Sequence, residues 1–398
     1  MIRFSDRLQA LPGYPLAEIP SIKRRLIEAG MDVIDLGAGD NDTPPPDTVL
    51  AAMHEALKQP ALSKYGFQQG LMGYRQAISR WVERRFGIRF DPASETLPLL
   101  GSKEGLSHLP VAVVNQGDVV LVPEPGYQAY IGGAILSGAV PHICPLRAER
   151  KFLLELDDVP ADVLKRAKLV FANYPNNPTA AVANTEYLTR LVNNCRKHGI
   201  LLAYDNAYCE LTYDGYRAPS IFEIPGARDV AIEFFSLSKS YSMTGWRIGF
   251  AVGRSELIGA LTRVKSYVDT GPWLAIQQAA VAVLDNSDAL VAPVRAELER
   301  RRDAGVAALN ANGIACEAPH AAMYLWVPLP AGIASAPFAR RVLEETGVVL
   351  LPGSGFGPAG EGYFRIALTV GAPRLEEAAR RIASVLAVTP RDELAAAR

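Results

Sequence analysis

The sequence predicts an α/β fold built on a mostly parallel sheet with helices on both faces. Its 398 residues are 49% hydrophobic and 21% charged, an ordinary globular composition with enough chain for two or three domains. Short apolar runs alternate with amphipathic stretches through the middle of the chain, as buried parallel strands and their crossover helices do. The runs are Val119–Val122, Leu169–Ala172, Leu201–Tyr204, Val230–Phe235 and Ile248–Val252.

One repeat of this pattern is complete enough to define a unit. The stretch Asn173–Asp205 follows one apolar run, contains an expected helix at Thr185–His198 and ends with the next run. Its length of roughly 30 residues is that of a βαβ unit. Because ligands of open α/β sheets bind beyond the carboxyl ends of the strands, the polar residues after each run are the candidate site residues.

The two ends of the chain follow a different pattern. The turn-rich GAGDNDTPPP at residues 37–46 ends an N-terminal arm and entry helix, and Thr270–Pro272 precedes a long helical stretch. Short strands are then expected at Met323–Val327, Gly347–Leu351 and Tyr363–Leu368, before a closing helix from Arg374. We expect the arm and part of a small domain at residues 1–46, a large domain at 47–285 and a C-terminal small domain at 286–398.

Charge and composition exclude several functions. The formal net charge is −1, and the densest basic cluster, Arg295–Arg302, alternates with Glu as a solvated helix does, so no nucleic-acid partner is expected. The N-terminus lacks the apolar segment of a signal peptide and no run approaches a membrane span, which predicts a cytoplasmic protein with no membrane partner. The four cysteines form no CxxC pair and are expected to be reduced thiols. The five histidines are widely spaced, so no metal is expected.

The motif with the most chemical content follows the apolar run VAIEFF. Lys239 lies among small hydroxyl and aromatic residues in SLSKSYSMTGWR, which suits a ligand pocket better than a solvated face. A lysine nucleophile must be neutral part of the time, so it needs burial or cationic neighbours. Ser236, Ser238 and Arg247 supply hydroxyls and a guanidinium, the groups that hold a phosphate. Most lysines are solvated surface residues, so Lys239 is a candidate only because of these neighbouring residues.

The S-x-S-K motif, with Arg eight residues after the Lys and then I-G-F, resembles the pyridoxal-phosphate (PLP) site of the class I/II aminotransferases. These are fold type I enzymes, so the resemblance implies a large domain with a mostly parallel seven-stranded sheet sandwiched by helices, plus a smaller α+β domain. It also implies that Lys239 carries PLP as a Schiff base and moves a proton to and from the substrate. Ser236, Ser238 and Arg247 would bind the phosphate.

Two further strand-end motifs fit the same resemblance. In YDNAY, Asp205 would pair with the protonated pyridine nitrogen and Tyr208 would bond the ring's phenolic oxygen. A helix-capping Asp beside a core Tyr would give the same letters. In NYPNNPT, Asn177 would reach the same phenolic oxygen and the substrate, although Ala180 stands where the family usually has Gly, and N-N-P-T alone is merely a good turn.

The resemblance also assigns roles to residues beside the cofactor's phosphate and beside its pyridine ring. Ser102 and Lys103, in GSKEG, would add a hydroxyl, a charge and helix N-terminal N–H groups for the phosphate. Tyr127, in PGY, would stack on the pyridine ring, although a core aromatic is the ordinary alternative.

The chain's two ends would supply the substrate contacts. Arg365, in YFRIAL, would bind the substrate α-carboxylate through its planar fork. Gly39 matches the family's substrate-side glycine and Tyr14 a substrate-contacting tyrosine. Tyr65 resembles the tyrosine lent to the neighbouring subunit's phosphate, which implies a homodimer with shared active sites.

The reaction expected from this resemblance is ping-pong transamination from an amino acid to 2-oxoglutarate or pyruvate. The same residues could catalyse β-elimination, as in a C–S lyase. A non-catalytic PLP-binding sensor is a more distant alternative. Leu11-Pro12-Gly13-Tyr14, GSKEG and PGYQAY resemble the branch of LL-diaminopimelate and N-succinyldiaminopimelate aminotransferases, related to alanine and aspartate enzymes. The turn DNDTPPP departs from that branch's usual D-P-D-x-P-x-P, so the amino donor stays open.

Overall fold

The computed structural model describes residues 3–13, 19–67 and 69–389, and its largest element is a seven-stranded sheet. In spatial order the strands are β2 (Thr96–Leu99), β8 (Gly249–Gly253), β7 (Ala231–Ser236), β6 (Leu201–Asp205), β5 (Ala167–Asn173), β3 (Val119–Glu124) and β4 (Val140–Pro145). Strand β8 is antiparallel to both of its neighbours, and the other pairings in this sheet are parallel. The mostly parallel seven-stranded sheet is therefore confirmed.

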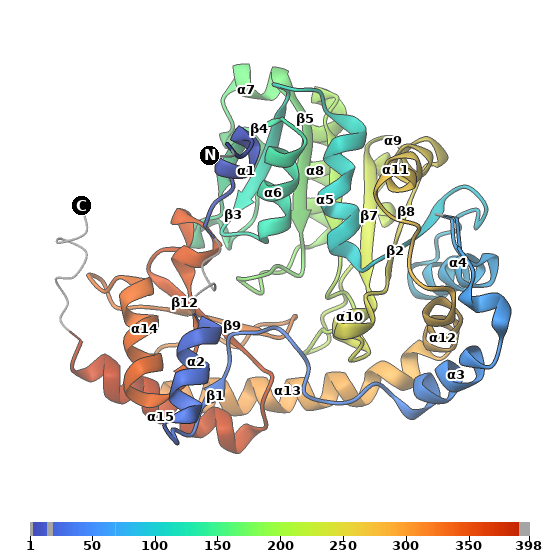
Figure 1. Cartoon of the computed structure of the whole chain (residues 1–398). Coiled ribbons are helices and arrows are strands. Elements are labelled where there is room, and N and C mark those ends of the chain that lie inside the picture. Colours follow the sequence, from blue (N-terminus) through green and yellow to red (C-terminus); the bar gives the residue numbers. More distant parts are fainter. Residues whose placement is uncertain (1–2, 14–18, 68, 390–398) are drawn as a thin grey trace.

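Both faces of this sheet are apolar and covered by helices (Figure 1). On β5, Leu169 and Phe171 join the core beneath α5, α6 and α11, whereas Val170 and Ala172 join the core beneath α4, α8 and α12. Because successive side chains of a strand point to opposite faces, a strand covered twice must be apolar at every position. That requirement explains the continuous apolar runs of the sequence.

Helices connect these strands and cover the sheet, and α8 shows how the sequence sets their ends. The Asn184 side chain accepts the N–H of Tyr187 at its start, and Gly199 ends it with a positive φ of 66°. The helices are α1 (Asp6–Gln9), α2 (Ile19–Glu28), α3 (Asp47–Leu57), α4 (Met72–Phe86), α5 (Ser102–Val113), α6 (Gln128–Leu136), α7 (Ala161–Arg166), α8 (Thr185–His198), α9 (Ala227–Val230), α10 (Leu237–Ser240), α11 (Ser255–Val268), α12 (Leu274–Asp285), α13 (Ser287–Ala311), α14 (Ser335–Thr346) and α15 (Ala372–Ala387). No helix within the described ranges combines the length and hydropathy that crossing a bilayer requires.

A second, smaller layered region contains the C-terminal third. Strands β11 (Leu351–Pro352), β12 (Tyr363–Ala367) and β9 (Tyr324–Pro328) form an antiparallel sheet. The N-terminal β1 (Ile34–Asp35) pairs in parallel with β10 (Val348–Val349), which brings the two ends of the chain together. The expected strand Gly347–Leu351 is thus two short strands with different partners. The expected long helical stretch is likewise two helices, α12 and α13, that meet at Asn286, and α13 runs beneath both regions in Figure 1.

The strand register places polar side chains at one edge of the large sheet. Asn173, Asp205 and Ser236 are the last residues of the adjacent parallel strands β5, β6 and β7. Asn173 is in register with Asp205. The carboxyl ends of these strands, where ligands of such sheets bind, therefore carry polar groups.

Candidate active site

A cavity of about 420 Å³ lies at this edge, between the large sheet and the C-terminal region. Elements from both ends and the middle of the sequence contribute to its walls. The predicted site residues that line it are Gly39, Ser102, Lys103, Tyr127, Asn177, Asp205, Tyr208, Ser236, Ser238, Lys239, Arg247 and Arg365.

Two predicted site residues are not part of this lining. Tyr65 lies on the surface and is 70% exposed. Tyr14 lies outside the residues that the structure describes.

Lys239 reaches the cavity from α10, the short helix that begins directly after β7. The Ser236 hydroxyl accepts the N–H of Ser238 at 3.2 Å and caps this helix. The Lys239 Nζ donates a hydrogen bond to the carbonyl oxygen of Gly39. A Cβ on Gly39 would lie 2.3 Å from the Tyr324 hydroxyl, so only glycine allows the N-terminal turn to approach this closely.

Asp205 is a buried carboxylate in the cavity wall, and its two oxygens differ in their hydrogen bonds. The Tyr130 hydroxyl donates to Oδ2 at 2.8 Å, whereas Oδ1 has no hydrogen-bond partner among the described residues. Burial raises the pKa of Asp205 to about 6, against the opposing effects of the Tyr130 hydrogen bond and the nearby Ala207 N–H. A buried carboxylate oxygen without a donor is costly, so it suits a ligand that brings a positively charged N–H.

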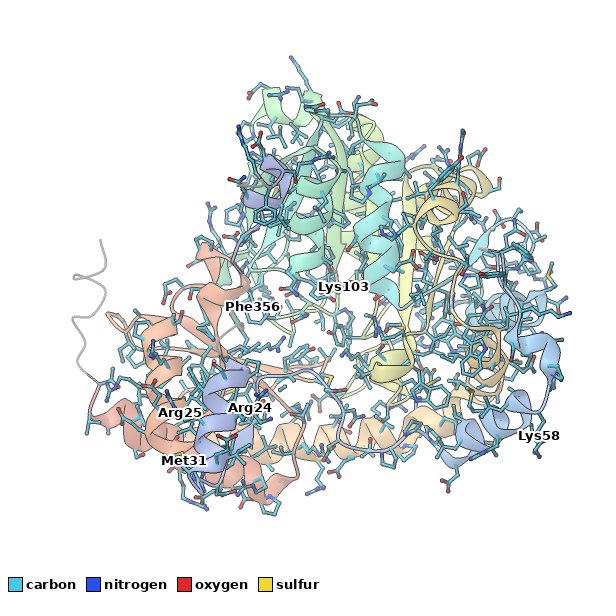
Figure 2. All side chains as sticks on the ribbon, viewed as in Figure 1. Arg24, Arg25, Met31, Lys58, Lys103 and Phe356 are labelled. Atoms are coloured by element: carbon cyan, nitrogen blue, oxygen red, sulfur yellow. The ribbon has the colours of Figure 1, made fainter. Side chains whose placement is uncertain are left out.

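The start of α5 lines the same cavity with groups that suit an anion. Gly101 turns the chain with a φ of 77°, and Ser102 and Lys103 then present the first N–H groups of the helix. Arg247 lies beside this turn, donating to the carbonyl oxygens of Thr244 at 2.8 Å and Leu100 at 3.3 Å. Figure 2 shows Lys103 at the cavity end of α5, toward the centre of the molecule. A helix N-terminus beside a guanidinium is well suited to a phosphate group.

Arg365 brings a buried guanidinium to the cavity from β12. It donates to the Asn177 side-chain oxygen at 2.8 Å and to the Gly37 carbonyl oxygen at 2.6 Å. Its guanidinium carbon lies 4.1 Å from the centre of the Tyr324 ring and 4.8 Å from that of Phe356. Phe356 is labelled in Figure 2 on the C-terminal region, facing the middle of the molecule. Two aromatic ring faces and two oxygen acceptors hold the planar guanidinium in place, and its fork matches the two oxygens of a carboxylate.

Several residues of the site were not predicted from the sequence, among them Asn173, Tyr130, Tyr324 and Phe356. Asn173 donates to the Asp205 carbonyl oxygen at 2.8 Å and accepts the N–H of Asn177 at 2.7 Å, so it fixes the turn that carries Asn177. It directly follows an apolar run, and the strand-end rule could have found it. Tyr130, Tyr324 and Phe356 reach the site through packing alone and leave no local signal in the sequence.

These groups match the parts of PLP. The start of α5 and Arg247 fit the phosphate, the unpartnered Oδ1 of Asp205 fits a protonated ring nitrogen, Tyr127 lines the wall between them, and Lys239 fits the aldehyde. The combination of this sheet and this site defines the class of fold type I PLP-dependent enzymes.

Comparison with known proteins narrows this class. The sequence model of the family "Aminotransferase class I and II" matches residues 31–382, so the chain belongs to that family and is a PLP-dependent aminotransferase. It is 48% identical to the LL-diaminopimelate aminotransferase of Nitratidesulfovibrio vulgaris strain Miyazaki F, over 96% of this chain and 99% of the relative. Identity to the Aquifex aeolicus LL-diaminopimelate aminotransferase is 46%, over the same shares. The structure of a probable N-succinyldiaminopimelate aminotransferase from Thermus thermophilus superposes with a TM-score of 0.89 at 38% identity, covering 93% of this chain and 100% of that one.

Proposed function

We propose that this aminotransferase uses LL-diaminopimelate as its amino donor and 2-oxoglutarate or pyruvate as its acceptor. The observation that carries this proposal is the likeness to LL-diaminopimelate aminotransferases along almost the whole length of both chains. The cavity supports it because the buried guanidinium of Arg365 and the Lys239 amine line the same pocket. That arrangement suits an α-amino acid, in which the carboxylate and the amine are attached to the same carbon.

The residues that would hold the cofactor are assigned by the chemistry of their side chains. PLP, when bound, supplies an aldehyde carbon that takes up the amino group and a ring that withdraws electrons from the substrate. Asp205 would accept the ring N–H through Oδ1 and stay ionised, since a cationic partner lowers the pKa that burial raises. Tyr208 and Asn177 would donate to the phenolic oxygen, and Tyr127 would cover one ring face. The phosphate would bind Ser102, Lys103, Ser236, Ser238 and Arg247.

Substrate handling would fall to Lys239, Arg365 and Asn177. Arg365 and Asn177 would bind the α-carboxylate and so turn the Cα–H bond toward the lysine. The Lys239 Nζ would take the proton from the substrate Cα and deliver it to the carbon of the cofactor's former aldehyde group, which requires the amine to be neutral when it accepts the proton. Gly39, whose carbonyl oxygen accepts from this amine, would let the substrate pass beside the backbone.

We also propose a homodimer in which Tyr65 serves the partner's phosphate. Tyr65 and Phe67 are 70% and 71% exposed, and Trp273, which bonds the Leu62 carbonyl in the adjoining segment, is 44% exposed. Such a group of exposed aromatics is typical of a protein interface. The division of each subunit at residues 46 and 285 remains part of this proposal, supported by separate apolar cores in the two regions.

The amino donor is tested with the purified protein and a panel of donors against both acceptors. We expect kcat/KM for LL-diaminopimelate to exceed that for aspartate, alanine and N-succinyl-LL-diaminopimelate by at least about tenfold, the size of one well-made polar contact. A higher kcat/KM for any of these would contradict the donor. Release of pyruvate and ammonia from cystathionine, without amino transfer, would contradict the reaction.

The shared site is tested by mixing two defective variants. Lys239→Ala removes the lysine of a site, and Tyr65→Ala removes the tyrosine that we assign to the neighbouring site. After unfolding and joint refolding, random pairing would give hybrids with one intact site each and recover up to about a quarter of wild-type activity. No recovery, with both variants dimeric by ultracentrifugation, would mean that Tyr65 does not act across the interface.

A further inference from the structure

Lys265, near the end of α11, has a side chain that is 0% exposed. Its Nζ lies 2.7 Å from Glu104 Oε2 and 2.9 Å from Asp269 Oδ1. A buried ammonium is costly unless it is paired and hydrogen-bonded, and both requirements are met here. None of these three residues lines the cavity.

Glu104 links this ion pair to the turn in front of α5. Its Oε2 also accepts the N–H of Leu100 at 3.1 Å. On the other side of the same residue, the Leu100 carbonyl oxygen accepts a hydrogen bond from Arg247 at 3.3 Å. The two peptide groups that flank Leu100 are therefore held by Glu104 and Arg247, and the left-handed Gly101 follows directly. This turn decides where the first N–H groups of α5 point.

The cluster carries more negative charge than Lys265 can neutralise. Glu104 Oε1 lies 3.1 Å from His108 Nδ1, and Asp269 Oδ1 also accepts the N–H of Gly271 at 2.6 Å. Candidate ligand atoms of Glu104, His108 and Asp269 lie within 4.8 Å of one another, as in a metal site, but the Lys265 ammonium already bridges the two carboxylates. Without that ammonium, two close carboxylates would stand behind a site for a phosphate dianion.

We propose that Lys265 is a positioning residue for the cofactor phosphate. By neutralising Glu104 it keeps that carboxylate on the Leu100 N–H, and so holds the turn that presents Ser102 and Lys103 to the phosphate. It also shields the phosphate from the Glu104 and Asp269 charges, which would otherwise oppose the favourable field of the helix N-terminus. This inference rests on the proposed binding of the phosphate at the start of α5.

The test compares binding of PLP and of pyridoxal, which lacks the phosphate, to the full-length protein freed of cofactor. In Lys265→Met we expect the Kd for PLP to rise about tenfold to a hundredfold, the range for one charge-assisted hydrogen bond, and the Kd for pyridoxal to change by less than about threefold. Adding Glu104→Gln to Lys265→Met should restore most of the PLP affinity, because the amide keeps an acceptor for Leu100 and removes the charge. Lys197→Met, which removes an exposed lysine from α8, is the matched control.

A purely structural role would weaken PLP and pyridoxal binding equally and would not be rescued by Glu104→Gln, so either result would overturn the inference. If Lys265→Met does not fold, Lys265→Arg keeps the charge and should keep the ratio of the two affinities within about threefold of wild type. A larger change in that ratio, in a folded Lys265→Arg protein, would also overturn it. A wild-type protein that binds PLP no more tightly than pyridoxal would instead refute the proposed phosphate site itself.

Discussion

Two buried carboxylates on neighbouring strands of the large sheet have different surroundings. Glu233 on β7 accepts hydrogen bonds from Ser220, Asn206 and the N–H of Ile221, so both of its oxygens have donors. Asp205 on β6 has the Tyr130 hydroxyl on one oxygen and no hydrogen-bond donor in the described part of the chain for the other. Burial raises the pKa of both, to about 8 for Glu233 and about 6 for Asp205.

Buried polar groups can serve stability or catalysis, and the surroundings of Glu233 and Asp205 indicate one of each. The Glu233 cluster completes its hydrogen bonds within the chain and lies outside the cavity, so we expect it to affect stability. Asp205, Lys239 and Arg365 line the cavity, so we expect their substitution to affect catalysis with little effect on stability. Substitutions in the two regions therefore test whether Glu233 serves stability and Asp205 serves catalysis.

The largest effect is expected at Lys239. Lys239→Ala should abolish turnover, because it removes the amine that bonds Gly39 in the cavity. Lys103 is the only other lysine among the described residues that line the cavity, and it lies at the start of α5. The protein should keep its fold, with a free energy of unfolding within about 1 kcal/mol of wild type when both lack cofactor. Initial rates and denaturant titrations measure the two effects, with Lys197→Ala as control. Appreciable turnover in Lys239→Ala would show that the reaction does not require this lysine.

The second-largest effect is expected for Asp205→Asn. Its kcat/KM should fall about a hundredfold or more, which is the cost of losing one preorganised charge at a reacting group. The amide keeps the shape and an acceptor for Tyr130 but cannot stabilise a protonated ring nitrogen. Because the substitution removes a buried charge, one oxygen of which has no hydrogen-bond donor among the described residues, the cofactor-free protein should melt at the same or a higher temperature. A clear fall in that melting temperature, with activity retained, would place Asp205 with Glu233 as a structural residue.

Arg365→Lys should cost less, about tenfold to a hundredfold in kcat/KM and mostly through KM. A lysine keeps the charge but loses the planar fork that can bind a carboxylate twice. Steady-state kinetics with the amino donor and with the 2-oxo acid should show both KM values raised, since both substrates carry the carboxylate. An unchanged KM for both would rule out this role.

The smallest effect on activity is expected for Glu233→Gln, together with an effect on stability that depends on pH. A carboxyl group with a pKa of 4.5 in the unfolded chain and about 8 in the folded one binds more protons when folded, so wild-type stability should fall as the pH rises from about 4.5 to about 8. The Gln variant should lack this slope, giving a relative gain on the order of a few kcal/mol at high pH, since one pKa unit corresponds to about 1.4 kcal/mol. Cofactor-free denaturation across this pH range measures it, and parallel curves for the two proteins would contradict the assignment.

The sequence by itself determined the large sheet and the residues at its edge. Strands covered on both faces must be apolar throughout, so β3, β5 and β6 appear as continuous apolar runs. The residues that follow such runs lie at the carboxyl edge because of strand geometry alone, which is why Asn177, Asp205 and Lys239 could be nominated in advance.

Only the tertiary structure decided which distant groups complete the site. Tyr130 reaches Asp205 from α6, and Tyr324 and Phe356 pack on Arg365 from the C-terminal region, through contacts between residues far apart in the sequence. The division of the expected strand Gly347–Leu351 between two sheets also depends on partners elsewhere in the chain. Local patterns encode burial and turns, whereas the identity of a packing partner is set by how whole layers meet, and no local signal in the sequence carries it.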